Sequence, residues 1–66
     1  MANAKWLAHD YDKGVLVELK EKYGNISRIR CNVLYEKDNT FYLSDKDGLI
    51  GSFPKANYSA KIIKDV

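Results

Sequence analysis

Apolar and polar residues alternate along most of this chain, and the alternation predicts short β-strands. The clearest example is the stretch 40–54, where two β-prone runs flank the segment 45–48, Asp-Lys-Asp-Gly. An Asp-Gly pair between alternating apolar residues is the strongest short-range signal for a β-hairpin. We therefore predict an antiparallel hairpin formed by residues 41–45 and 49–53, against which the rest of the chain packs.

The register of this hairpin decides which side chains face inward, because a shift of one residue turns every side chain to the opposite face. A loop of two residues, Asp47 and Gly48, would pair Tyr42 with Phe53 and would mix apolar and polar side chains on both faces. A loop of three residues would place Gly48 in the left-handed conformation of a bulge and would pair Asp45 with Leu49. The pattern favours the longer loop, because it gathers apolar side chains on one face. These side chains are Phe41, Leu43, Leu49 and Phe53.

Further strands are predicted on both sides of the hairpin. They lie at 5–9, 29–35 and 60–66, and they are separated by turns at 11–14, 36–39 and 55–58. Trp6 would anchor the first strand, which we expect at a sheet edge, to the core. Cys31 would be a buried thiol on the apolar face of the second strand, together with Ile29, Val33 and Tyr35. Ile62 and Ile63 would contribute to the core from the last strand.

Residues 15–23 fit two kinds of secondary structure. In a strand, the inward side chains would be Val15, Val17, Leu19 and Tyr23. The stretch also presents one apolar face as a helix, because Glu, Leu and Lys are good helix formers and Gly24 would end it. The alternation favours the strand, and the helix stays open as the alternative.

A strand at 15–23 would create a basic face. A three-residue loop at 24–26 would join it to the strand at 29–35 and bring four cations together. They are Lys20, Lys22, Arg28 and Arg30, with Lys20 opposite Arg30 and Lys22 opposite Arg28. Like charges across strands destabilise a sheet, so an acidic partner, either phosphate or an acidic protein patch, would explain this face. Screening by Glu18, Glu21 and solvent is the alternative explanation.

The length limits the architecture. A chain of 66 residues has room for one domain, 1–66, with a small core. About five or six short strands joined by tight turns predict an all-β fold, either a small antiparallel barrel or a strongly bent sheet. Cys31 is the only cysteine, which excludes an internal disulfide, and with His9 it falls short of four zinc ligands. A homodimer is the remaining common source of extra stability.

Composition bears on location and chemistry. The first five residues carry no apolar run, so we expect neither a signal peptide nor a membrane anchor. The single cysteine favours a reducing, cytoplasmic setting. A net charge of +2 is too small to indicate nucleic-acid binding by itself. His9 is the only histidine, and Asp10 and Asp12 beside it are more simply a solvated turn than catalytic partners in a sheltered site, so we expect no enzymatic activity, no metal site and no cofactor.

Several short motifs resemble those of Src-homology-3 (SH3) domains. Residues 48–54, Gly-Leu-Ile-Gly-Ser-Phe-Pro, followed by Asn57-Tyr58, resemble the carboxy-terminal half of that family. Phe41-Tyr42 occupies the place of the paired aromatic residues that precede the family's hairpin. Residues 7–11, Leu-Ala-His-Asp-Tyr, look like its opening motif. The resemblance is spread over most of the chain.

The resemblance to SH3 domains implies a five-stranded barrel and an aromatic groove that binds proline-rich peptides. On this chain the groove would consist of Tyr11, Phe41, Pro54 and Tyr58. Two departures from the family pattern bear on this groove. His9 replaces the first tyrosine of the opening motif, and Ala56 lengthens the segment that follows Pro54.

Two classes of function follow from these patterns. The first is a non-catalytic module, of the adaptor or inhibitor type, that binds another protein through exposed aromatic side chains. Its predicted contact residues are Tyr11, Tyr42, Pro54 and Tyr58, whereas Phe41 is expected in the core. The second is a nucleic-acid-binding protein that uses the basic face. Protein binding is favoured, because the net charge is small and nearby carboxylates balance the cations.

Overall fold

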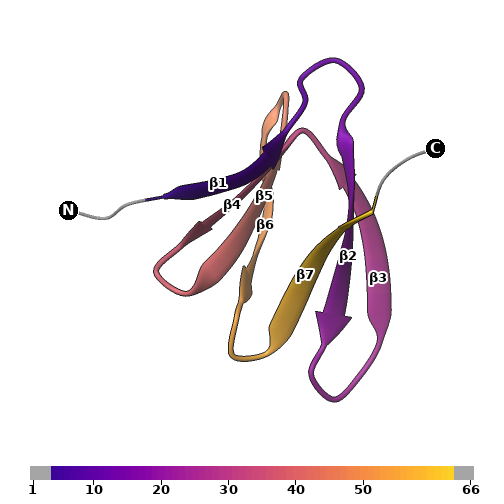
Figure 1. Ribbon diagram of the computed structural model, residues 1–66, viewed down its shortest axis with the longest axis vertical. Coiled ribbons are helices and arrows are strands. Elements are labelled where there is room, and N and C mark those ends of the chain that lie inside the picture. Colours follow the sequence, from indigo (N-terminus) through magenta and orange to yellow (C-terminus); the bar gives the residue numbers. More distant parts are fainter. Residues whose placement is uncertain (1–3, 64–66) are drawn as a thin grey trace.

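Within residues 4–63, the chain folds into seven strands that form two antiparallel sheets (Figure 1). The computed structural model describes residues 4–63. The strands are β1 (Lys5–His9), β2 (Val15–Glu21), β3 (Ile26–Cys31), β4 (Val33–Lys37), β5 (Thr40–Asp45), β6 (Gly48–Pro54) and β7 (Tyr58–Ile63). Sheet A has the strand order β1-β4-β5-β6, and sheet B has the order β3-β2-β7. The all-β prediction is confirmed, but the sheets do not close into a barrel and the strands are more numerous than predicted.

Asn32 divides the strand predicted at 29–35 into two strands of different sheets. Its first part belongs to β3, which pairs with β2, and its second part belongs to β4, which pairs with β1 and β5. The Asn32 N–H donates to the Ser44 carbonyl, and the Asn32 carbonyl accepts from the Asp10 N–H; the N···O distance is 2.8 Å in both bonds. The side-chain amide of Asn32 also donates to the Asp10 carbonyl over 2.9 Å. These bonds fix the corner at which the chain passes from sheet B to sheet A.

The corner reverses which residues face inward. Cys31 packs in the core before the corner, and Leu34 packs there after it. Inward side chains are therefore odd-numbered in β3, before Asn32, and even-numbered in β4, after it. The buried core consists of Val17, Leu19, Cys31, Leu34, Phe41 and Leu43. Val33 is also buried, at 4% exposure, but it alternates with Leu34 and lies on the opposite face of sheet A. The predicted common face of residues 29, 31, 33 and 35 is therefore wrong beyond the corner.

The predicted hairpin consists of β5 and β6, and Phe41 lies opposite Phe53 as expected. Its loop is shorter than the favoured one. Asp45 pairs with Gly48 rather than with Leu49, which leaves Lys46 and Asp47 in the turn. Gly48 adopts a φ of 133°, a conformation that residues with a Cβ rarely accept.

A bulge in β6 accounts for the shorter loop. Leu43 pairs with Gly51 but its neighbour Ser44 pairs with Leu49, so Ile50 is the extra residue of β6. The bulge turns Leu49 to the outer face of sheet A, where its side chain is 59% exposed. The prediction that Leu49 joins the core face is therefore wrong.

Residues 15–21 form strand β2, which confirms the strand and excludes the helix. The turn to β3 comes earlier than predicted, because the Glu21 N–H donates to the Asn25 carbonyl over 3.0 Å and closes the loop there. Glu18 consequently pairs with Arg28, and the predicted opposition of like charges is wrong. Tyr23 lies in the loop and is 93% exposed instead of facing inward.

The strands at the two ends of the chain hold different side chains in the core than predicted. β1 lies at a sheet edge as expected, but Trp6 is 62% exposed, while Leu7 and Ala8 pack against the core. In β7, Ala60 packs against the core, whereas Ile62 is 41% exposed. The remainder of the last predicted strand, 64–66, lies outside the described residues.

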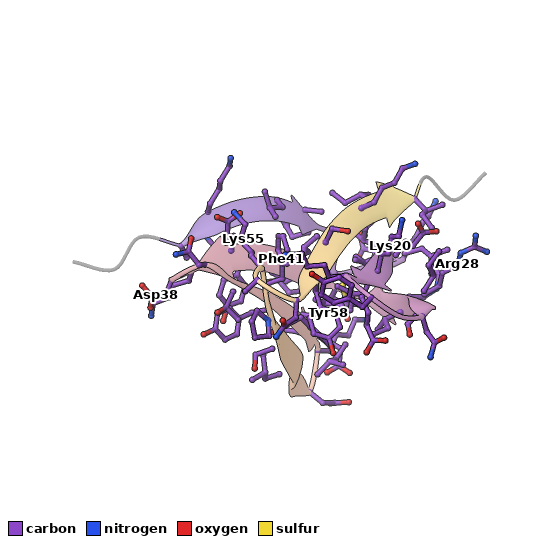
Figure 2. All side chains as sticks on the ribbon, turned by 90° about the horizontal axis from the view of Figure 1, so that it is seen from below. Lys20, Arg28, Asp38, Phe41, Lys55 and Tyr58 are labelled. Carbon is purple, nitrogen blue, oxygen red and sulfur yellow. The ribbon has the colours of Figure 1, made fainter. Side chains whose placement is uncertain are left out.

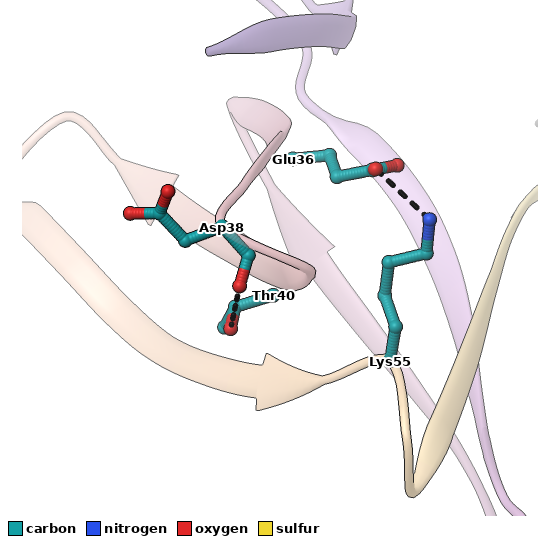
Figure 3. A network of polar contacts seen from close by, with 4 residues as sticks. All are labelled: Glu36, Asp38, Thr40 and Lys55. Atoms are coloured by element: carbon teal, nitrogen blue, oxygen red, sulfur yellow. Dashed lines mark hydrogen bonds and ion pairs between the residues drawn. The ribbon is translucent and has the colours of Figure 1, made fainter. Parts of the chain in front are cut away.

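A tight turn at Asp38 and Asn39 joins β4 to β5. Both residues have positive φ, 52° and 58°, which matches the mirror-image turns that suit the twist of a hairpin. The Thr40 hydroxyl donates to the Asp38 carbonyl over 3.3 Å (Figure 3). The backbone N–H of Lys55 donates to the Asn39 carbonyl over 2.9 Å, so this turn also positions the start of the β6–β7 turn.

Candidate functional site

A row of aromatic side chains crosses the outer face of sheet A. Trp6 on β1 lies opposite Tyr35 on β4, and Tyr35 lies opposite Tyr42 on β5. The ring centroids of Trp6 and Tyr35 are 5.2 Å apart, and those of Tyr35 and Tyr42 are 5.0 Å apart. Both distances fall in the range in which aromatic pairs attract one another. The row is therefore held in one geometry by its own contacts.

Further side chains, most of them aromatic, extend this row into a surface. His9 follows Trp6 on β1, and its ring centroid lies 5.8 Å from that of Tyr11. Trp6, His9 and Tyr11 border a shallow hollow of about 390 Å³. Tyr11 is 55% exposed and Leu49, across the sheet, is 59% exposed. We name this surface the aromatic face, and it comprises Trp6, His9, Tyr11, Tyr35, Tyr42 and Leu49.

Carboxylates gather at one end of the aromatic face. The β1–β2 turn and the β5–β6 turn lie at the same end of the molecule (Figure 1). The carboxylates of this acidic end are Asp10, Asp12, Asp45 and Asp47. The Asp10 carboxylate accepts hydrogen bonds from the backbone N–H groups of Lys13 and Asp12, each with an N···O distance of 3.0 Å. The bond from Lys13 and then that from Asp12 hold the pKa of Asp10 below its ordinary value, which keeps the carboxylate charged.

A groove lies at the opposite end, between the β2–β3 turn and the β6–β7 turn. It has a volume of about 400 Å³ and continues into a second hollow of about 360 Å³. The two hollows share Glu21, Lys22, Asn57 and Tyr58. The Lys22 N–H donates to the Asn57 carbonyl over 2.8 Å, so the two turns are bonded at the floor of the groove. We name this site the end groove.

Aromatic and cationic side chains both line the end groove. Lys20 and Lys55 line its first hollow, and Tyr23 lines the second. Tyr58 is half-buried and contacts Phe53 edge to face, with the ring centroids 5.3 Å apart. Figure 2 shows Tyr58 below the core residue Phe41, between the two sheets, with Lys20 on the side of sheet B. The site is thus concave, basic and partly aromatic.

The outer face of sheet B carries the other predicted cations in a new arrangement. Arg28 forms an ion pair with Glu18, with Nε and Oε2 3.4 Å apart, and Lys61 lies opposite Glu18 from the other side. Arg30 lies opposite Leu16, and its guanidinium donates to the Lys13 carbonyl over 3.4 Å. Lys22 lies beyond the end of β2, in the turn that borders the end groove. The predicted set of Lys20, Lys22, Arg28 and Arg30 is therefore divided between a sheet face and the groove.

The predicted protein-binding residues are also divided. Tyr42 belongs to the aromatic face, and Tyr11 lies at its edge beside His9. Tyr58 lies in the end groove, opposite Glu21 at the far end of β2 from Tyr11. Pro54 is exposed at the end of β6, and Phe41 is 8% exposed, as expected for a core residue. The peptide groove implied by the resemblance is not assembled, because its residues lie at different ends and depths.

Sequence reasoning missed Trp6 and Tyr35 as surface residues. The sequence predicts Trp6 as an anchor of the first strand to the core, and the alternation of residues 29–35 places Tyr35 on the apolar face. A signal was present in Leu34, an apolar residue at an outward position of the predicted alternation and directly after apolar Val33. Two adjacent apolar residues are compatible with a shift of the inward positions by one, which turns Tyr35 outward and Leu34 inward.

The described part of the chain offers no metal site and no reactive thiol. Residues 4–63 contain no group of three or more His, Cys, Asp or Glu side chains placed to hold a metal ion. Cys31 is 2% exposed, and burial raises the pKa of its thiol, which disfavours the reactive thiolate. Nor do these residues form any helix with the length and apolarity that a membrane crossing requires.

Comparison with known proteins identifies no relative. No known protein family, curated protein or solved structure matches the chain.

Proposed function

We propose that this protein is a non-catalytic interaction module, of the adaptor or inhibitor type, that binds another protein through the aromatic face. The observation that carries the proposal is that Trp6 is 62% exposed although its ring packs on Tyr35. Trp and Tyr are enriched among the residues that dominate binding energy at protein interfaces. A side chain that is already ordered by its neighbours also loses less conformational entropy when a partner covers it.

The charges around the aromatic face define the chemistry of the partner. Asp10, Asp12, Asp45 and Asp47 border the face at its acidic end, with Lys13 and Lys46 as the neighbouring cations. The resulting excess of negative charge repels a nucleic-acid backbone and attracts a basic protein surface. The partner therefore presents an apolar patch that covers Trp6 and, beside it, cations that meet the acidic end.

The architecture supports a binding module of the SH3-like type. If β3 and β4 are followed as one strand bent at Asn32, the order β7-β2-β3/β4-β5-β6 is continuous and antiparallel. The resemblance to that family implies a barrel of five strands; here the five strands stay open, and β1 is added at the free edge of β4. The proposal does not include the family's proline-peptide groove, because Tyr11 and Tyr58 lie at opposite ends of β2.

The proposal is tested by capture with matched variants. The chain serves as bait in a nuclease-treated lysate of its native cells, either unchanged, as Trp6→Ala, or as Tyr23→Ala. Tyr23 is 93% exposed and lies away from the aromatic face, so it controls for the loss of an exposed aromatic ring. We expect a protein that is retained by the unchanged chain and by Tyr23→Ala, and lost with Trp6→Ala.

A second readout comes from the tryptophan itself. Trp6 is the only tryptophan, so its fluorescence reports on the aromatic face alone. The purified partner should shift the Trp6 emission to shorter wavelength as it excludes water from the ring. Equal capture by the Trp6→Ala variant, or capture without any change in Trp6 emission, would show that another surface binds the partner.

A further inference from the structure

We propose that the end groove is a binding site for single-stranded nucleic acid, separate from the aromatic face. The site unites residues that the sequence assigned to two different surfaces, Lys20 and Lys22 from the basic face and Tyr58 from the predicted protein-binding residues. Its volume of about 400 Å³ lies within the range of ligand sites, which is roughly 300 to 1,000 Å³. The inference goes beyond protein binding and does not depend on it.

Two lysines of the end groove, Lys20 and Lys22, carry positive charge without an ion-pair partner among the described residues. Lys55 is different, because its Nζ lies 2.9 Å from Oε2 of Glu36 (Figure 3). Two exposed ammonium groups at the mouth of one groove attract an anion, and phosphates supply such charge at regular spacing.

The one carboxylate in the lining is directed toward its own turn. Oε2 of Glu21 accepts a hydrogen bond from the Asn25 N–H over 3.0 Å. It also curls over Gly24, where an added Cβ would lie 2.4 Å from the same oxygen. Glu21 therefore caps the β2–β3 turn and leaves the lysines of the groove free to meet a ligand.

The aromatic rings distinguish a nucleic acid from an acidic peptide. Tyr23 is 93% exposed, and Nζ of Lys22 lies 5.7 Å from the centre of its ring. Tyr58, fixed against Phe53, lines the same groove. Proteins that bind single strands combine cations along the backbone with rings on which bases stack. An acidic peptide would use the cations and leave an exposed ring such as Tyr23 without a role.

A cationic path leads away from the end groove. Lys20 lies on the outer face of sheet B, where its neighbour along β2 on that face is Glu18. Arg28 and Lys61 lie opposite Glu18 on either side, so two cations border one carboxylate. A strand that leaves the groove at Lys20 can therefore continue across sheet B with its phosphates near these cations.

The test uses a fluorescein-labelled strand of twelve thymidine nucleotides, and its binding is followed by anisotropy as the salt concentration rises. The unchanged protein should bind at low salt, and its affinity should fall steeply as salt rises. The double variant Lys20→Gln, Lys22→Gln should reduce the slope of log K against log salt by about 1.4, since each lost phosphate contact on a single strand removes about 0.7. The control is Lys13→Gln, Lys46→Gln, which removes the same charge at the acidic end and should leave the slope unchanged.

A variant at Tyr23 tests the stacking component. Tyr23→Leu should weaken binding at least fivefold without changing the salt slope, because loss of a stacked ring affects each salt concentration equally. Three results would overturn the proposal: no binding to the unchanged protein at low salt, equal effects of the two lysine double variants, or full affinity in Tyr23→Leu. Competition by a poly-glutamate peptide as strong as that by the unlabelled oligonucleotide would assign the groove to acidic polypeptides and would also overturn it.

Discussion

The aromatic face and the end groove display the same kinds of ring in different surroundings. On the aromatic face, Tyr35 stands between two other rings on a paired strand, and carboxylates lie at the border. At the end groove, Tyr23 projects from a turn, and the ammonium group of Lys22 lies over its ring. Identical side chains can therefore serve different ligands, because the backbone that holds them and the charges beside them differ.

The largest expected difference between the two regions is in stability. Tyr35→Ala removes a half-buried ring with contacts on both sides, and should lower the free energy of unfolding by about 2–3 kcal/mol. Tyr23→Ala removes an almost fully exposed ring and should change it by less than about 0.5 kcal/mol. Urea unfolding followed by Trp6 fluorescence and by circular dichroism measures both. Equal losses would show that the row on sheet A is not a packed unit.

A smaller effect on stability is expected from substitution of Arg28, because its cross-strand partner differs between the observed register and the predicted one. Under the predicted register, Arg28→Glu would replace a repulsion by an attraction and stabilise the sheet. In the structure, Arg28 lies opposite Glu18, so the change should destabilise the protein by about 0.5–1 kcal/mol. Arg28→Gln is the matched control and should cost less, since it removes the attraction without adding a like charge. Stabilisation by Arg28→Glu would contradict the observed pairing of β2 with β3.

The smallest effect concerns the acidic end. Because hydrogen bonds from Lys13 and Asp12 lower the pKa of Asp10 in the folded state, its charge favours folding above the unfolded pKa of about 3.9. This contribution is lost as pH falls through the folded value. Asp10→Asn should therefore be less stable than the unchanged protein near neutral pH, and the difference should shrink as the pH falls below about 4. A difference that is independent of pH would assign the effect to the hydrogen bonds alone.

The fold was predictable where local chemistry decides it. The turn signal at Asp47-Gly48 and the alternation on both sides identified the hairpin, and β2 followed from its own pattern. The exact residues at which the turns lie were not predictable in the same way, and the predictions were displaced by one or two residues. The Glu21–Asn25 closure and the bulge at Ile50 each shift a register, and both depend on contacts that form only in the folded chain.

The candidate sites were predictable only in part. The sequence identified Tyr42, Tyr58, Lys20 and Lys22 as candidate surface residues. The structure groups them differently, because Lys20, Lys22 and Tyr58 line the end groove and Tyr42 lies on the aromatic face. Asn32 explains much of this outcome, because one polar corner residue reverses the inward positions and separates the two sheets. The end groove joins turns that are distant in the sequence, and no periodicity within a single strand could reveal it.

The separation of the two surfaces is tested most directly by one titration with two signals. The twelve-nucleotide thymidine strand is added to the unchanged protein while its anisotropy and the emission of Trp6 are recorded together. Because the end groove lies away from the aromatic face, anisotropy should rise to saturation while Trp6 emission stays constant. Quenching of Trp6 in parallel with the rise in anisotropy would place the bases on the aromatic face and contradict the division of the molecule into two separate binding surfaces.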